Sequence, residues 1–169
     1  MTRRLWLLRH GKSDWHAGTP DDFDRPLAKR GGRDAARMGE WLAARGPLPD
    51  HVVSSPAQRA RQTTLAVCGS LGIGKRQVFW DTRIYEAPLD QLLEVLADCP
   101  ASATCTLLVG HNPGLDELLM HLSGGHAEAD PKGKLMTTAA LAELALPDDW
   151  SVLPAGCAEL IIQQRPRDL

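Results

Sequence analysis

The chain has 169 residues, which is the size of one compact domain. Its 19 Lys and Arg side chains against 21 Asp and Glu give a formal net charge of -2, which argues against nucleic acid or an anionic membrane as a partner. We expect neither a signal peptide nor a membrane span, because no apolar run approaches the ~20 residues that a span needs. Four cysteines without a CxxC spacing indicate a reduced, cytoplasmic protein without disulfides.

Short apolar runs alternate with amphipathic stretches along the whole chain. This alternation predicts a single α/β domain over residues 1–169, in which helices flank a mostly parallel central sheet as three layers. We expect strands at 5–8, 51–54, 77–80, 106–109, 139–146 and 159–163. We expect helices over 29–44, over the apolar stripes at 60–71 and 89–96, and from 114 to about 122. The Gly-rich, polar stretch 123–134 is predicted to be a surface loop.

Polar clusters follow three of the predicted strands directly. They are residues 9–13 (Arg-His-Gly-Lys-Ser), 54–59 (Ser-Ser-Pro-Ala-Gln-Arg) and 110–113 (Gly-His-Asn-Pro). Ligands of open α/β sheets bind beyond the carboxyl ends of the strands. We therefore expect the three clusters to meet in one crevice.

Arg59 occupies a position that an anion would favour. Ser55 followed by Pro56 is typical of a helix N-cap with proline as the first helical residue. Arg59 would then lie in the first turn, where a cation opposes the helix dipole unless an anion binds there. Asn112-Pro113 repeats the cap-and-proline pattern just after His111. Two helix N-termini are thus predicted to point at one anionic ligand.

Arginine and histidine suit the chemistry of a phosphoryl group. The planar guanidinium donates two parallel hydrogen bonds to phosphate, and a neutral histidine can act as a nucleophile. We predict that neighbouring arginines lower the pKa of His10 and keep it unprotonated. Two arginines and a second, protonated histidine, His111, would then hold the equatorial oxygens without a metal or cofactor. The remaining histidines show no spacing typical of metal ligands: His16, His51, His121 and His126.

In this order, these residues resemble the histidine phosphatase superfamily, and most of all its short SixA-like phosphohistidine phosphatases. The resemblance extends over 9–11, 55–59 with 62–63, 110–114, Arg25-Pro26-Leu27 with Gly31, 85–87 and 133–135. It implies a phosphoglycerate mutase-like fold. It also implies that His10 becomes phosphorylated while Arg9, Arg59 and His111 bind the phosphoryl group, with no cofactor. Lys12 and Ser13 are further candidates for phosphate contacts, with a structural role as the alternative.

The general acid is not fixed by the resemblance. Glu86 lies roughly where the mutases carry their acid, and Asp116 is a second candidate, although a first-turn carboxylate also suits the helix dipole. An imidazole leaving group departs easily, so a phosphohistidine substrate makes a strong acid unnecessary.

Three functions stay open at this point. The first is a phosphatase acting on a phosphorylated protein, such as a histidine phosphotransfer domain. The second is a phosphatase of small phosphomonoesters or a mutase-like enzyme, although Lys12 replaces the glutamate usual in mutases and lid insertions are missing. The third is a phosphate-binding module without turnover.

Overall fold

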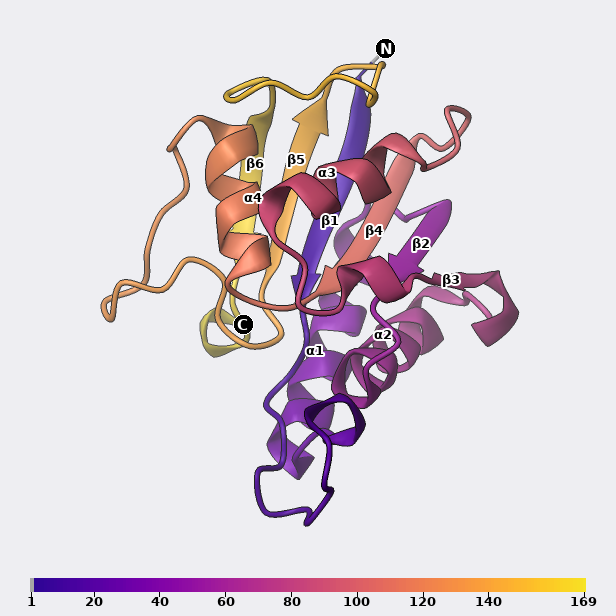
Figure 1. The fold of residues 1–169 in the computed structure, drawn as a ribbon, viewed down its shortest axis with the longest axis vertical. Helices are drawn as coiled ribbons and strands as arrows, with labels where there is room; N and C mark the ends of the chain where they lie inside the picture. Colours follow the sequence, from indigo (N-terminus) through magenta and orange to yellow (C-terminus); the bar gives the residue numbers. More distant parts are fainter. Residues whose placement is uncertain (1) are drawn as a thin grey trace.

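The fold is that of an α/β domain with a six-stranded sheet between two layers of helices (Figure 1). The structure is a computed structural model, and it describes residues 2–169. The strands, in sheet order β3-β2-β4-β1-β5-β6, are β1 (Arg3–Arg9), β2 (His51–Ser54), β3 (Val78–Trp80), β4 (Cys105–Gly110), β5 (Leu141–Leu146) and β6 (Glu159–Gln164). The helices are α1 (Lys29–Arg45), α2 (Gln58–Leu71), α3 (Leu89–Ala97) and α4 (Gly114–Ser123). The predicted fold class is confirmed.

The register of the sheet brings three strand ends together. β1 and β2 both pair with β4 in parallel, and Arg9 lies opposite Gly110 while Ser54 lies opposite Val109. Among the described strands, β5 pairs antiparallel with both β1 and β6, so it alone runs against the direction of the others. The carboxyl ends of β1, β2 and β4 therefore lie side by side, and the clusters that follow them meet at this edge.

Alternate residues of the buried strands face opposite helical layers. In β1, Leu5 and Leu7 belong to the core under α3 and α4, whereas Trp6 and Leu8 belong to the core under α1 and α2. All six residues of β4 are buried. Burial on both faces is typical of parallel strands that helices cover on each side, and it fixes the register of the central strands.

The helix that carries Arg59 begins later than predicted. α2 starts at Gln58, so Ser55 is not its N-cap. Ser55 Oγ accepts a hydrogen bond from the Ala57 amide at 3.2 Å and also lies 2.7 Å from His111 Nε2. The serine hydroxyl is thus engaged by a histidine, and the chain enters the helix two residues later. Arg59 still lies in the first turn.

α4 begins at the predicted residue, but its cap differs from the expected cap-and-proline pattern. Its first helical residue is Gly114 and not Pro113. Asn112 Oδ1 nevertheless accepts a hydrogen bond from the Asp116 amide at 3.2 Å, so the asparagine satisfies a free amide of the first turn as a capping residue does.

Gly31, in the first turn of α1, lies against the backbone that follows His10. A Cβ at Gly31 would come within 2.1 Å of the Lys12 carbonyl oxygen, and a Cβ at Gly11 within 2.7 Å of the Gly31 oxygen. The Ala28 amide also donates a 2.8 Å hydrogen bond to the Lys12 oxygen. α1 can approach the loop after β1 this closely only because both positions are glycine.

We expect Gly31→Ala to lower the free energy of unfolding by about 1–3 kcal/mol, because backbone atoms must move to admit the methyl group. Activity should fall as well, since the displaced backbone adjoins His10. Gly32→Ala is the matched control, because a Cβ at Gly32 meets nothing within 4 Å and alanine favours the helix. Urea unfolding and a phosphatase assay on both variants check this. Equal stability of the two variants would contradict it.

None of the helices in the described part of the chain has the length and apolar character that a bilayer span requires. All four cysteines carry free thiols.

Candidate active site

His10 lies just beyond the end of β1 with 7% of its surface exposed. Its Nδ1 is 2.7 Å from the Gly11 carbonyl oxygen. A carbonyl oxygen can only accept, so Nδ1 carries the proton of the neutral ring. Nε2 is then left with a free electron pair, as a nucleophile requires.

The surroundings of His10 keep its ring neutral. Burial, together with the positive charges of Arg9, Arg59 and Arg25, lowers its pKa to about 4 despite the opposing effect of the hydrogen bond to Gly11. The predicted neutral state is thus found, but burial contributes more to it than the arginines that the sequence suggested.

His111, beyond the end of β4, lies next to His10 with 5.1 Å between the ring centroids. Burial, followed by the proximity of His10 and Arg59, lowers its pKa to about 3. His111 is thus neutral in this structure, in contrast to the protonated form expected around a phosphoryl group, because its burial, which the sequence does not reveal, is the largest cause of the low pKa. Among the described residues its buried Nδ1 has no hydrogen-bond partner.

The contact with Ser55 is compatible with a His111 ring that is protonated at Nδ1. Ser55 Oγ accepts from the Ala57 amide, and its hydroxyl proton is free to be donated to His111 Nε2. The proton of the neutral His111 ring then resides on Nδ1, where it can be donated to an oxygen of a ligand.

Arg59 reaches the same pocket from α2 and is only 5% exposed. Its two terminal nitrogens donate to Asp22, one to the main-chain oxygen at 2.7 Å and one to the carboxylate at 2.9 Å. Thr63 ties Arg59 to the nucleophile, because its Oγ1 donates to the Arg59 carbonyl at 2.8 Å and accepts from the Gly11 amide at 3.0 Å. Arg59 and His10 are thereby positioned through one hydroxyl group.

Arg9 approaches from the opposite side and is held by the loop before β5. One terminal nitrogen donates to the Met136 oxygen at 3.1 Å, and the same oxygen accepts from Asn112 at 2.9 Å. Asp116 accepts a hydrogen bond from the Met136 amide at 2.9 Å. This contact gives Asp116 a role in holding the loop. It offers no support for the other role considered for Asp116, that of general acid.

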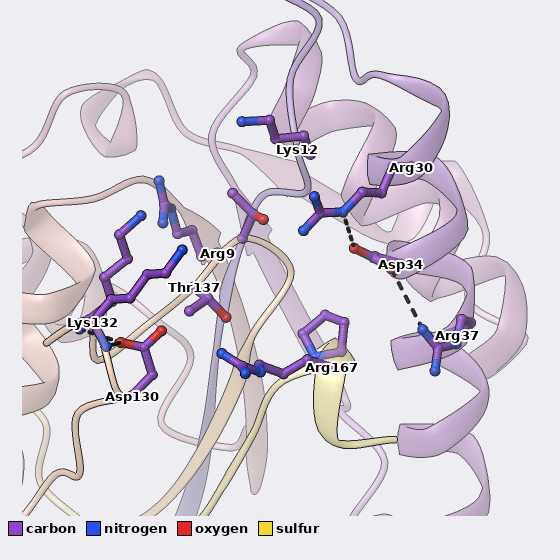
Figure 2. A pocket seen from close by; sticks show the side chains of 12 residues that line it. Arg9, Lys12, Arg30, Asp34, Arg37, Asp130, Lys132, Thr137 and Arg167 are labelled. Carbon is purple, nitrogen blue, oxygen red and sulfur yellow. Dashed lines mark hydrogen bonds and ion pairs between the residues drawn. The ribbon is translucent and has the colours of Figure 1, made fainter.

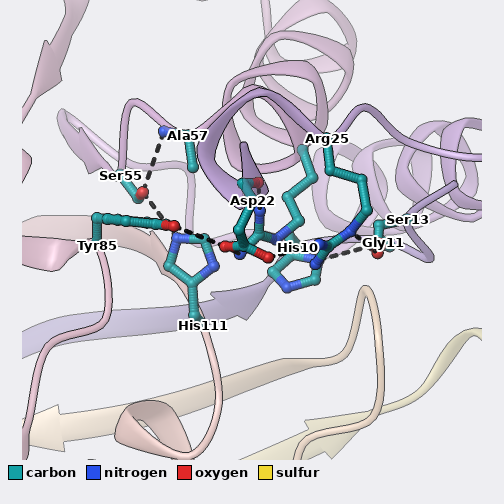
Figure 3. A network of polar contacts seen from close by, with 10 residues as sticks. His10, Gly11, Ser13, Asp22, Arg25, Ser55, Ala57, Tyr85 and His111 are labelled. Carbon is teal, nitrogen blue, oxygen red and sulfur yellow. Dashed lines mark hydrogen bonds and ion pairs between the residues drawn. The ribbon is translucent and has the colours of Figure 1, made fainter. Parts of the chain in front are cut away.

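Asp22 is a central residue of the site that the sequence did not reveal. It lies in a short 3-10 turn (Asp22–Asp24) and its carboxylate accepts from Tyr85 Oη at 2.6 Å, from Arg59 and from Arg25 (Figure 3). Partial burial alone would raise its pKa, but the hydrogen bonds from Tyr85, Arg25 and Arg59 hold the pKa well below its usual range. Asp22 therefore stays ionised beside the two histidines.

Arg25 is a further pocket residue that we did not predict as a ligand, although its Arg25-Pro26-Leu27 segment is part of the family resemblance. Its Nε donates to Ser13 Oγ at 3.2 Å. Ser13 and Lys12 line the same cavity of about 250 Å³ as the two histidines and the three arginines. Ser13 is buried and orients Arg25, whereas Lys12 is exposed at the rim.

Glu86 is exposed and lines an adjoining cavity of about 470 Å³ together with Asp22, Arg59 and His111. Its backbone adopts the left-handed conformation, with φ 55°, at which residues other than glycine are uncommon. Its role as general acid stays a prediction. Within residues 2–169, no three His, Cys, Asp or Glu side chains gather in a way that would hold a metal ion.

The low histidine pKa values have a consequence for stability. In the unfolded chain both histidines bind protons near pH 6.5, whereas in the folded protein His10 does so near pH 4 and His111 near pH 3. The contribution of the two histidines to the free energy of unfolding is therefore fully present above pH 6.5 and declines as the pH falls toward 4. We expect a loss on the order of a few kcal/mol in this window.

Urea unfolding at several pH values from 7.5 to 4 measures this loss. The double variant His10→Asn/His111→Asn should show a flatter dependence over the same window. The lowered pKa of Asp22 does not contribute to the decline in this window, because the stability that it provides is lost only when the pH falls below the usual carboxyl range. An equally steep decline in the double variant would contradict the assignment.

Asp22→Asn is expected to tighten inhibition by tungstate or inorganic phosphate by about 3–10-fold, because a carboxylate that competes for Arg59 and Arg25 is removed. Competitive inhibition constants measure the effect. Asp24→Asn, at an exposed carboxylate of the same turn, is the matched control and should change little. Weaker inhibition in Asp22→Asn would mean that the carboxylate mainly positions Arg59.

Comparison with known proteins identifies the family to which the chain belongs. Residues 5–90 match the family model of the histidine phosphatase superfamily (branch 1). An uncharacterised protein of Mycobacterium tuberculosis is 35% identical over 164 residues, which cover 95% of this chain and 100% of that protein. The chain belongs to the histidine phosphatase superfamily, and it is a phosphatase.

Solved structures place it more narrowly. One that carries the name phosphohistidine phosphatase SixA, from Nakamurella multipartitia, is 31% identical, with a TM-score of 0.84 and coverage of 98% of this chain and 97% of that one. Another of the same name, from Agrobacterium tumefaciens, is 28% identical, with a TM-score of 0.79 and coverage of 98% and 99%. The chain is SixA-like, as the resemblance implied.

Proposed function

We propose that the protein hydrolyses protein phosphohistidine through a covalent phosphohistidine at His10. The observation that carries the proposal is the 2.7 Å contact between His10 Nδ1 and the Gly11 oxygen, which leaves Nε2 unprotonated inside a pocket of arginines. A neutral imidazole held in this way needs no separate base in order to attack phosphorus.

The reaction proceeds in two displacements. In the first, the electron pair of His10 Nε2 attacks phosphorus, the P–N bond to the substrate breaks, and the departing imidazole takes the bonding pair and a proton from water. In the second, water attacks phosphorus, the bond to Nε2 breaks and returns its electron pair to the ring, and the attacking water releases to solvent one proton, which replaces the proton taken up in the first step. Each step requires the entering and leaving atoms to lie in line.

The cations of the pocket replace a metal in this proposal. Arg9, Arg25 and Arg59 supply guanidinium groups that can donate to the equatorial oxygens, and His111 Nδ1 supplies a further donor. Fixed donors of this kind stabilise the charge of a phosphoryl transition state without reorganising. They are held before the substrate arrives by Met136, Ser13, Asp22 and Ser55.

The choice of phosphohistidine rests on the lack of support for a strong acid. Asp116 is engaged by the Met136 amide, and Glu86 is exposed at the edge of the pocket. A phosphomonoester has a poor alkoxide leaving group that needs a proton, whereas imidazole leaves readily. The names of the SixA-like structures from Nakamurella and Agrobacterium point in the same direction.

A substrate panel tests the proposal. We expect a phosphohistidine peptide to be hydrolysed with a higher kcat/KM than phosphoglycerates, sugar phosphates or phosphoserine peptides, with or without a chelator. Reaction with ³²P-labelled substrate followed by quenching should trap an acid-labile, alkali-stable phosphoenzyme in the wild type and none in His10→Ala. A preference for small phosphomonoesters would reassign the substrate. Phosphate binding without turnover of any substrate would instead indicate a binding module.

A further inference from the structure

A second, strongly cationic cavity of about 620 Å³ adjoins the active site (Figure 2). Arg9, Lys12 and Thr138 line both cavities, so the two are contiguous. The other basic side chains around it are Arg30 and Arg37 of α1, Lys132 and Lys134 of the loop before β5, and Arg167 near the C-terminus. None of these five is required by the reaction proposed above.

The cavity concentrates positive charge on an acidic protein. Seven of the 19 Lys and Arg side chains line it, but only two of the 21 Asp and Glu side chains. The remainder of the chain then has 12 basic and 19 acidic side chains. An acidic partner is repelled by most of the surface and attracted to this cavity, which orients the encounter.

The two carboxylates leave much of this charge available. Asp34 lies 3.7 Å from both Arg30 and Arg37, which is longer than a hydrogen bond. Asp130 Oδ1 accepts from the main-chain amides of Lys132 and Lys134, at 3.0 and 2.7 Å, and so stabilises its own loop. The side chain of Lys132 extends away from this carboxylate in Figure 2.

The arrangement of these cations identifies the kind of ligand. In the active site, buried donors converge on a space for one compact group, and Arg59 is 5% exposed. In the second cavity, long exposed side chains come from three separate segments and spread over a volume larger than one phosphate. Such a spread fits several carboxylates at different positions better than one tetrahedral anion.

We propose that this cationic cavity binds Asp and Glu side chains that flank the phosphorylated histidine of a protein substrate. The proposal rests on the function proposed for the neighbouring pocket. Since Arg9 and Lys12 border both cavities, an acidic segment can occupy one while its phosphohistidine enters the other. The cavity thereby selects among phosphohistidine proteins by the charge of the sequence around the histidine.

Two phosphohistidine peptides of equal length test this selection, one with Asp and Glu and one with Asn and Gln around the histidine. We expect the wild type to favour the acidic peptide by about 10-fold in kcat/KM, through KM, and to lose the preference at high salt. The double variant Lys132→Gln/Lys134→Gln should lose most of that preference and keep its kcat and its activity on the neutral peptide. Lys75→Gln/Arg76→Gln, at exposed positions outside the cavity, is the matched control and should behave as the wild type.

A binding measurement separates this inference from the proposed function. Fluorescence anisotropy follows an unphosphorylated acidic peptide on His10→Ala, with and without the two lysine substitutions. If neither phosphopeptide is hydrolysed but binding depends on the lysines, the proposed function fails and the acidic-segment site stands. If both phosphopeptides are hydrolysed equally well, the inference is overturned while the proposed function stands. The same holds if the cavity binds pyrophosphate but not the acidic peptide.

Discussion

Substituting His10 by alanine is expected to reduce turnover of every phosphorylated substrate by at least about 1000-fold, because the atom that attacks phosphorus is lost. The trapped phosphoenzyme should disappear together with the activity. Alanine also removes a buried imidazole whose Nδ1 contacts the Gly11 oxygen, so the fold of the variant must be verified by urea unfolding and circular dichroism.

Oxyanion binding separates a chemical defect from a structural one. Arg9, Arg59 and His111 are unchanged in His10→Ala, so tungstate should still bind with an affinity within about 10-fold of the wild type. His16→Ala, at an exposed histidine outside the pocket, should leave turnover within about twofold. A His10→Ala enzyme that retains turnover would show that another group attacks phosphorus.

Arg59→Lys is expected to lower kcat/KM by about 100–1000-fold, although it keeps the positive charge. A guanidinium donates two parallel hydrogen bonds from a planar group, and an ammonium acts as a single point charge. The shorter lysine also loses one of the two contacts to Asp22, at 2.7 and 2.9 Å, that orient the side chain.

Steady-state kinetics of Arg59→Lys with a phosphohistidine peptide provide the measurement. Arg61→Lys on the same helix is the matched control, because Arg61 lies over the ring of Trp80, at 4.4 Å, and does not line the pocket. The control should retain activity within a few-fold. A similarly mild effect of Arg59→Lys would mean that Arg59 contributes charge alone.

The pattern of apolar and polar residues was sufficient to predict the fold class and the central residues of the site. Apolar runs bounded by polar clusters predict strands and their ends, and parallel strands that end together bring those clusters together. His10, Arg59 and His111 could be placed in one pocket on this basis, because each directly follows or closely follows a strand. The structure brings all three together with Arg9.

Asp22 and Tyr85 could not be found in this way. They are 63 residues apart, and their 2.6 Å contact depends on how the turn at 22–24 folds back over the pocket. No strand end precedes Asp22, and a turn rich in aspartate is ordinary at a surface. The neutral form of His111 in this structure was not foreseen for a related reason. Burial sets its pKa, and burial is a property of the assembled fold.

The Thr63 hydroxyl, which contacts both the Gly11 amide and the Arg59 carbonyl, makes the nucleophile and the arginine parts of one rigid unit. A substitution at Thr63 would therefore alter the setting of the nucleophile and of the guanidinium at the same time.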